Sequence, residues 1–429
     1  PLMYIYVYTF TNNEMTAVWK TCERIWIHVH LATLDPALEE SYGRLFDQAL
    51  GVRDGRIVAI GPMAELEGLT LSAEIIDAEG RWLTPGLIDP HTHLIFAGNR
   101  AAEFEQRLLG ASYEEISRNG GGILSTVTAT RNASVDELVA LAEPRLRALL
   151  AEGVTTLEIK SGYGLELSSE LNMLRAAKQL QQRYPVRIST TLLGAHALPL
   201  EYSDDADGYI DWVCEVLIPA AVSENLTDAV DVFCETIAFS TAQCERVFQA
   251  AQRHGLGIKA HAEQLSNLQG AALAARYGAW SADHLEFLDE TGVMAMAQAG
   301  SVATLCPGAF YVLRQNQRPP IDLFRQHRVP MAVATDLNPG SSPLASLRLA
   351  MHMACTLFQL TPAEALAGTT RCAAQALNLG EQLGQLKVGM IADMVLWNIE
   401  HPAELAYQFG VNTLAQRIVA GELNNVSAH

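Results

Sequence analysis

The chain has 429 residues, of which 49% are hydrophobic and 18% are charged, and its formal net charge is −19. The apolar content is enough for a large core, so we expect an ordered protein over most of its length. The negative charge argues against nucleic acid and against an anionic membrane as partners, and no apolar run approaches the length of a membrane span. A small anionic substrate would therefore need local positive charge at its site.

The cysteines and the first residues bear on the cellular compartment of the protein. The seven cysteines include no pair with C-x-x-C spacing, so we expect reduced thiols, no thiolate zinc site and a cytoplasmic location. Residues 1–14 lack the basic start and the cleavage site of a signal peptide. We expect them to be an extension without a role.

Residues 15–84 are predicted to form short strands separated by turns. The stretch RIWIHVHLATL alternates in polarity, and GVRDGRIVAIG places Asp54-Gly55 between two apolar runs, which is a strong hairpin signal. After residue 380 the stretch GQLKVGMIADMVLWN shows the same strand and turn pattern. We therefore expect residues 15–84 and 380–429 to form one small β-sandwich domain from both ends of the chain.

Residues 85–379 follow a different pattern, in which short apolar runs alternate with helical periods. Eight strand–helix pairs can be counted. Two of the helices are predicted to begin with capping boxes, Ser134 with Glu137 and Ser240 with Gln243. Eight parallel strands close into a TIM-like (β/α)8 barrel, whose active site lies at the carboxyl ends of the strands.

Imidazoles and a carboxylate fall at these predicted strand ends. His91 and His93 follow the first strand in LIDPHTH, His261 ends the fifth strand and Asp336 ends the eighth. An isolated H-x-H is a weak signal, but a period of two turns both rings to the same face of a strand. Imidazole nitrogen and carboxylate oxygen are ligands that zinc and iron accept, so these four residues predict a metal site.

Two further residues bear on proton transfer and on the number of metal ions. Asp336 can both ligate a metal and accept a proton from water, and His284 ends the sixth strand, next to His261. Some barrel hydrolases bridge two metal ions with a carboxylated lysine on strand four. Here Lys160 ends strand two, and strand four has no lysine, so we expect one metal ion.

Candidate binding groups lie in the loops after the strands. Arg100 is a natural partner for a carboxylate. Further candidates, each of which could instead be an ordinary loop residue, lie in SGYGL, GAHAL and LNPGSS: Tyr163, His196, Asn338, Gly340 and Ser341.

These motifs resemble the amidohydrolase superfamily, whose pattern joins D-P-H-T-H to a strand-five His, a strand-six His and a strand-eight Asp; VGMIADMVLWN is similar to its C-terminal β segment. Within the superfamily, TLEIKSGYGL, LLGAHALP and ATDLNPGSSP are similar to stretches of the enzymes that hydrolyse 4-imidazolone-5-propanoate to N-formimidoyl-L-glutamate in histidine degradation. The resemblance covers about residues 50–420.

The resemblance implies that a metal-activated water opens the cyclic amide C–N bond. It implies one divalent or trivalent ion per chain, zinc or iron, and a homodimer. Gln264 stands where some relatives have Glu, so it can orient the ring, and we expect proton transfer from Asp336 and His284. The implied ligands are His91, His93, His261 and Asp336, and the implied substrate contacts are Arg100, Tyr113, Tyr163, His196, Gln264, Asn338, Gly340 and Ser341.

Two other functions stay open. A deaminase of a purine-like heterocycle would use the same metal site and release ammonia, although Arg100 and LNPGSS favour a carboxylate-bearing substrate. A barrel without activity that serves in assembly is the other alternative, and the complete set of ligands argues against it.

Overall fold

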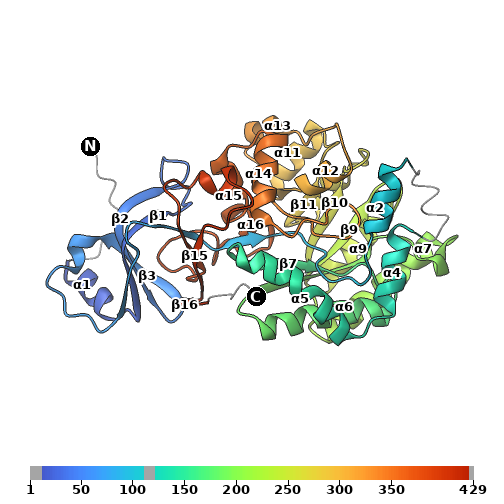
Figure 1. Ribbon diagram of the computed structural model, residues 1–429. Coiled ribbons are helices and arrows are strands. Elements are labelled where there is room, and N and C mark those ends of the chain that lie inside the picture. Colours follow the sequence, from blue (N-terminus) through green and yellow to red (C-terminus); the bar gives the residue numbers. More distant parts are fainter. Residues whose placement is uncertain (1–11, 111–120, 425–429) are drawn as a thin grey trace. The chain divides into compact units, whose positions relative to one another are not determined.

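The computed structural model describes residues 12–110 and 121–424 (Figure 1). They divide into two compact units. The first contains the described residues up to Gly86, together with Gln385–Pro402 and 413–424. The second contains the described residues of Leu87–Gly384, together with Ala403–Asn412.

The first unit is a mixed sheet built from both ends of the chain. Strand β1 lies inside the sheet, antiparallel to β2 and parallel to both β4 and β5, and β5 pairs with β14 from the C-terminal segment. The predicted hairpin is confirmed, because Asp54 and Gly55 join β2 to β3 with φ angles of 51° and 70°. The strands are β1 (Arg24–Ala32), β2 (Arg44–Arg53), β3 (Arg56–Pro62), β4 (Glu74–Asp77), β5 (Trp82–Pro85), β14 (Met394–Trp397), β15 (Leu414–Val419) and β16 (Glu422–Leu423).

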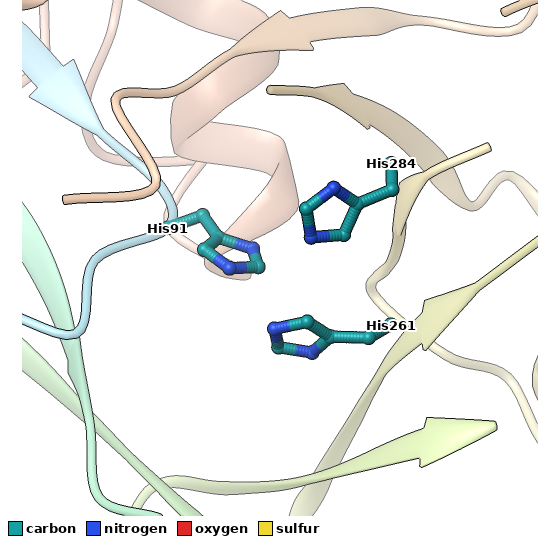
Figure 2. A group of neighbouring side chains, drawn as sticks. All are labelled: His91, His261 and His284. Atoms are coloured by element: carbon teal, nitrogen blue, oxygen red, sulfur yellow. The ribbon is translucent and has the colours of Figure 1, made fainter. Parts of the chain in front are cut away.

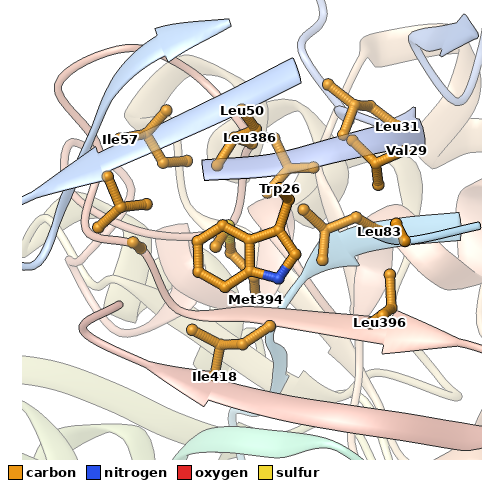
Figure 3. Close-up of a cluster of buried hydrophobic side chains, with 13 residues drawn as sticks. Trp26, Val29, Leu31, Leu50, Ile57, Leu83, Leu386, Met394, Leu396 and Ile418 are labelled. Atoms are coloured by element: carbon orange, nitrogen blue, oxygen red, sulfur yellow. The ribbon is translucent and has the colours of Figure 1, made fainter. Parts of the chain in front are cut away.

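One apolar cluster holds the two chain ends of this unit together (Figure 3). Trp26 of β1 and Leu83 of β5 are fully buried in it, and Met394 of β14 and Ile418 of β15 pack in the same cluster. The alternating pattern of RIWIHVHLATL has its physical basis here, since one face of β1 covers this cluster. A helix, α1 (Asn12–Lys20), and a short 3₁₀ turn, Met63–Leu66, complete the unit.

The second unit confirms the predicted barrel of eight parallel strands. Their order in the sheet follows their order in the chain. The strands are β6 (Leu87–Asp89), β7 (Val154–Lys160), β8 (Arg187–Ala195), β9 (Ala229–Cys234), β10 (Gly257–Ala262), β11 (Ser281–His284), β12 (Val302–Leu305) and β13 (Met331–Val333).

Helices surround these strands (Figure 1). Both predicted capping boxes are present, at Ser134 before α5 and at Ser240 before α9. The helices are α2 (Ala101–Leu108), α4 (Ile123–Arg131), α5 (Val135–Ala151), α6 (Leu167–Arg183), α7 (Ala206–Trp212), α8 (Ile218–Ser223), α9 (Thr241–Arg253), α10 (Gly270–Arg276), α11 (Glu290–Ala299), α12 (Pro307–Val312), α13 (Ile321–His327), α14 (Leu347–Phe358), α15 (Pro362–Gly368), α16 (Arg371–Ala376) and α17 (Glu404–Tyr407).

The boundaries of the units differ from the prediction in three places. Residues 403–412 belong to the barrel unit, because buried Arg348 on α14 donates hydrogen bonds to the carbonyls of Gln408 (3.1 Å) and Val411 (2.8 Å). Residues 380–384 also lie with the barrel. Helix α1 begins at Asn12, so the last residues of the expected extension are helical, and residues 1–11 are outside the described part.

Within residues 12–110 and 121–424, no helix combines the length and the apolar content needed to span a membrane. The seven cysteines all lie in this part of the chain, and none forms a disulfide.

The cluster in Figure 3 predicts the effect of a truncation in β5. Leu83→Ala should lower the free energy of unfolding of the first unit by about 2–5 kcal/mol, because it leaves a cavity among fully buried side chains. Urea unfolding followed by tryptophan fluorescence measures this loss. Ile75→Ala on β4 is the control, since Ile75 is 45% exposed and its loss should cost far less. Equal effects of the two substitutions would contradict the assignment of this core.

Candidate metal and substrate site

The barrel closes through the residues that carry the candidate ligands. The backbone N–H of Asp336 donates to the carbonyl of His91 (3.0 Å), and the N–H of His93 donates to the carbonyl of Leu337 (2.9 Å). These bonds join the segment after β6 to the segment after β13. The first and last strands of the barrel therefore place their histidines and aspartate side by side.

Four donor atoms converge at this point. His93 Nε2 lies 3.3 Å from the Nε2 atoms of both His91 and His261. Asp336 Oδ1 lies 3.2 Å from His91 Nε2 and 3.4 Å from His93 Nε2. A tetrahedral ion with bonds of about 2.0–2.1 Å needs donors about 3.3–3.4 Å apart. The four measured separations match this spacing, and all four residues are at most 4% exposed.

Carboxylates on the far side of the rings fix their orientation. Asp283 Oδ2 is 2.6 Å from His91 Nδ1, and Asp231 Oδ2 is 3.1 Å from His261 Nδ1. A carboxylate can only accept a hydrogen bond, so when the His91 ring is neutral Asp283 holds its proton on Nδ1, and Nε2 has the lone pair that a metal needs. Burial and Lys160 act to lower the pKa of His91, but Asp283 and Asp336 outweigh them and raise it to about 9.

These carboxylates belong to a buried ionic layer, which we define as Glu158, Asp231, Asp283, Lys160 and Lys259. Lys160 Nζ lies 2.6 Å from Asp231 and 2.8 Å from Glu158, and Lys259 Nζ lies 3.3 Å from Glu158. Every side chain of the layer is inaccessible to solvent. Although burial opposes it, the lysines and the histidines hold the pKa values of Asp231 and Asp283 below the usual value.

His284 borders the same space. Figure 2 shows the rings of His91, His261 and His284 directed toward one another, and one nitrogen of each lies within 4.8 Å of the others. Burial lowers the pKa of His284 to about 4, so the ring is neutral at neutral pH. Its Nδ1 has no hydrogen-bond partner among the described residues.

The backbone is strained where the strands end at this site. Glu263, His284, Leu285 and Asp336 have φ angles of 50°, 78°, 73° and 51°. Such conformations cost of order 1–3 kcal/mol each for residues other than glycine and cluster at functional sites. Here they turn the chain away from the barrel immediately after the residues that face its axis.

Two of the predicted substrate residues pack against His93. The ring of His196 stacks on His93 with centroids 5.3 Å apart, and Tyr163 lies 5.9 Å from His93 and 5.3 Å from His196. The Nδ1 of His196 donates to the carbonyl of Gly162 (2.8 Å), so its Nε2 is an acceptor in the neutral ring. Buried Glu170 holds this loop, because its carboxylate accepts from the N–H groups of Gly164 and Leu165.

The loop LNPGSS is organised by one of its own predicted substrate residues. Asn338 Oδ1 accepts from the N–H groups of Gly340 and Ser341, both at 2.8 Å, and Asn338 Nδ2 donates to the carbonyl of Asp336 (2.7 Å). The carboxamide is therefore engaged within the loop. It holds Gly340 and Ser341 close to the predicted metal ligand Asp336.

Arg100 lies against this loop. A Cβ at position 340 would be 2.4 Å from Arg100 Nη1, so a larger residue there would displace the guanidinium from its present position. Gln264 is buried three residues after His261, and Tyr113 lies outside the described residues.

Several buried charges were missed by the sequence analysis. They are Glu158, Asp231, Lys259, Asp283 and Glu170, together with Glu286, whose two carboxyl oxygens have no hydrogen-bond partner among the described residues. A signal for most of them exists in the sequence: charged residues stand inside otherwise apolar strands, as in VTTLEIK and AVDVFC, and charges in a buried strand need partners.

Comparisons with known proteins show the family of the chain. The amidohydrolase family model matches residues 82–423. The chain is 57% identical to the imidazolonepropionase of Hahella chejuensis, covering 94% of this chain and 99% of that protein. It is also 57% identical to the imidazolonepropionase of Colwellia psychrerythraea, covering 96% of this chain and 100% of that protein.

The fold is shared with more distant proteins. A zinc-bound adenosine deaminase from Xanthomonas campestris superimposes with a TM-score of 0.67 at 19% identity, over 94% of this chain and 92% of that one. A zinc complex of atrazine chlorohydrolase from Arthrobacter aurescens gives 0.66 at 16% identity, over 93% and 94%. At these identities the likeness extends to the fold alone.

The match to the family model over residues 82–423, together with the barrel, defines the chain as a member of the amidohydrolase family, and hence as a hydrolase. Within that family the chain belongs to the imidazolonepropionases, since identities of 57% extend over almost the whole of both chains.

The ionic layer predicts a measurable effect on metal binding. Asp283→Asn should weaken Zn²⁺ binding roughly 10- to 100-fold, because the amide no longer holds His91 in the required orientation. Competition with a chromophoric chelator measures the affinity. Asp322→Asn, at an exposed carboxylate on α13, is the control and should leave the affinity unchanged. An unchanged affinity in Asp283→Asn would show that the carboxylate does not position the ligand.

Proposed function

We propose that this chain hydrolyses 4-imidazolone-5-propanoate to N-formimidoyl-L-glutamate, a step of histidine degradation. The observation that carries the proposal is the match to imidazolonepropionases at 57% identity over almost the full length of both chains. The convergent donors of His91, His93, His261 and Asp336 support it, because hydrolysis of a cyclic amide at neutral pH needs an activated water.

In the proposed reaction, the oxygen of a water molecule bonds to the ring carbonyl carbon and the adjacent ring C–N bond breaks. The leaving nitrogen takes up a proton, and the carbonyl carbon becomes the new carboxylate of the product. A zinc or iron ion held by the four donors would lower the pKa of the water and polarise the carbonyl oxygen. The remaining tasks fall to side chains of the protein.

Proton transfer is proposed for two residues. Hydrogen bonds from His91 and His93 outweigh burial and hold the pKa of Asp336 well below its usual value, so this carboxylate is ionised and able to accept a proton. The neutral ring of His284 has an unpartnered Nδ1 within the described residues. We propose that it orients the attacking water and helps carry the proton to the leaving nitrogen.

The substrate is proposed to lie between the metal ligands and Arg100. Tyr163 and His196 pack on His93 and would bound the imidazolone ring, and Gln264 would orient it through its amide. Gly340 and Ser341, held by Asn338, lie next to Arg100, which would pair with the propanoate. Tyr113 is proposed as a further contact of the propanoate.

A product assay tests the function directly. Purified protein is incubated with freshly prepared 4-imidazolone-5-propanoate, with and without a strong chelator, and the product is identified by mass. Formimidoylglutamate should form only in the metal-replete sample. Unchanged imidazolone in protein with bound metal would contradict the proposal, and a screen for ammonia release from heterocycles would then test the deaminase alternative.

We also propose that the protein is a homodimer, as the resemblance to the family implies. Sedimentation velocity at micromolar concentration should give a single species with twice the mass of the chain. A species with the mass of one chain would contradict the dimer.

A further inference from the structure

A cavity of about 410 Å³ opens beside the segment that follows β6. Residues of this segment, of α2, of α5 and of the LNPGSS loop line it, and three of them are arginines: Arg100, Arg107 and Arg145. Among the described residues, no aspartate or glutamate lines the cavity. A concentration of positive charge is unusual in a chain with a net charge of −19, and it makes the cavity a site for an anion.

Arg100 is held at one edge of its guanidinium. Its Nε donates to Glu103 Oε2 (2.8 Å), and Glu103 Oε1 accepts from Gly122 N (3.1 Å) and Ser125 Oγ (3.0 Å). The Nη1 of Arg100 faces Gly340. Glu103 therefore already neutralises part of the charge of Arg100. Arg100 alone would bind the carboxylate of a ligand more weakly than an arginine without such a partner.

Arg145 is held without a counterion. Its Nη1 donates to the carbonyls of Leu94 (2.7 Å) and Phe96 (3.2 Å), and its Cζ lies 3.4 Å from the centre of the Phe96 ring. None of the described carboxylates lies within ion-pair distance of Arg145. Burial lowers its pKa to about 10, so it stays charged at neutral pH. A largely buried cation without an anion costs free energy unless a ligand supplies the charge.

The ring of Tyr163 lies near both Phe96, which lines the cavity, and His93. The Tyr163 ring lies 6.3 Å from Phe96, which stacks on Arg145, and 5.9 Å from His93. Burial and the charge of Asp336 raise the pKa of Tyr163, while Arg100 and Arg145 act in the opposite direction. The phenol therefore lies within the electrostatic reach of both arginines and of the metal ligand Asp336.

We propose that Arg145 is a second carboxylate-binding residue of the site, which together with Arg100 recognises the aliphatic carboxylate of the substrate through its unoccupied Nε and Nη2 donors. This inference rests on the proposed function for the identity of the substrate. The guanidinium is already rigid, because the Phe96 ring and two carbonyls hold it, so little side-chain entropy is lost when a carboxylate binds.

The alternative role for Arg145 is structural, since it also braces the carbonyls of the segment after β6. A test must therefore separate recognition of charge from support of the loop. We would use two ligands that the enzyme cannot hydrolyse, imidazole-4-propanoate and its neutral amide, imidazole-4-propanamide. Calorimetry gives the affinity of metal-loaded protein for each of them without any turnover.

In Arg145→Met, the affinity for the propanoate should fall roughly 10- to 100-fold, and the affinity for the amide should change by less than about threefold. Arg145→Lys should recover part of the propanoate affinity, because it keeps the charge but not the planar fork. The matched control is Arg147→Met, two residues along the same helix, where Arg147 packs on Tyr184 and donates to its hydroxyl. Its two affinities should equal those of the wild type.

Equal losses for the propanoate and the amide in Arg145→Met would overturn the proposal in favour of a structural role. Wild-type protein that binds both ligands equally would also overturn it. If Arg145→Met fails to fold, Arg145→Lys and Arg145→Gln provide the same comparison. A wild type that prefers the propanoate but does not hydrolyse 4-imidazolone-5-propanoate would contradict the proposed function and leave the role of Arg145 standing.

Discussion

The site depends on charged side chains that are inaccessible to solvent. Glu158, Asp231, Asp283, Lys160 and Lys259 form a closed ionic layer beneath the candidate metal position. Burial of each of these charged groups costs several kcal/mol of desolvation free energy. The layer is stable only because every charge has a close partner of opposite sign. The layer also orients a candidate ligand, since Asp283 accepts a hydrogen bond from Nδ1 of His91 and leaves Nε2 facing the candidate metal position.

Closure of the barrel is the second constraint. The candidate ligands come from the first, fifth and eighth barrel strands or the segments just after them, and the backbone hydrogen bond from Asp336 to His91 joins the first segment to the last. The chain has a positive φ angle at Asp336, and Gly340 of the loop that follows lies against Arg100. The rigid barrel sets the position of the reacting groups, and the loops set what can reach them.

The sequence predicted the fold well, because the fold depends on local patterns. Strand and helix periods, two capping boxes and the Asp54-Gly55 turn each involve residues close together in the chain, and the structure has them all. His91 and His93 could be placed on one face because they are two residues apart. Given eight strands, the geometry of a barrel then brings the strand ends together.

What the sequence could not predict depends on pairs that only the folded chain creates. Lys160 and Asp231 are 71 residues apart, and His91 and Asp283 are 192 apart. No local sequence pattern predicts which buried charged residues form ion pairs with each other. The same holds for residues 403–412, which contact the barrel through hydrogen bonds to Arg348 and His352 of α14.

The unit formed from both chain ends also has a consequence for synthesis. Strand β5 pairs with β14, and Thr84 accepts a hydrogen bond from Trp397, 313 residues later. At about 5–20 residues per second, β14 leaves the ribosome roughly 15–60 s after β5. During that interval all eight barrel strands are translated while one edge of β5 lacks its partner, and Trp26 and Leu83 lack part of their apolar cover. The C-terminal strands are therefore synthesised last, and they complete the unit whose N-terminal strands are synthesised first.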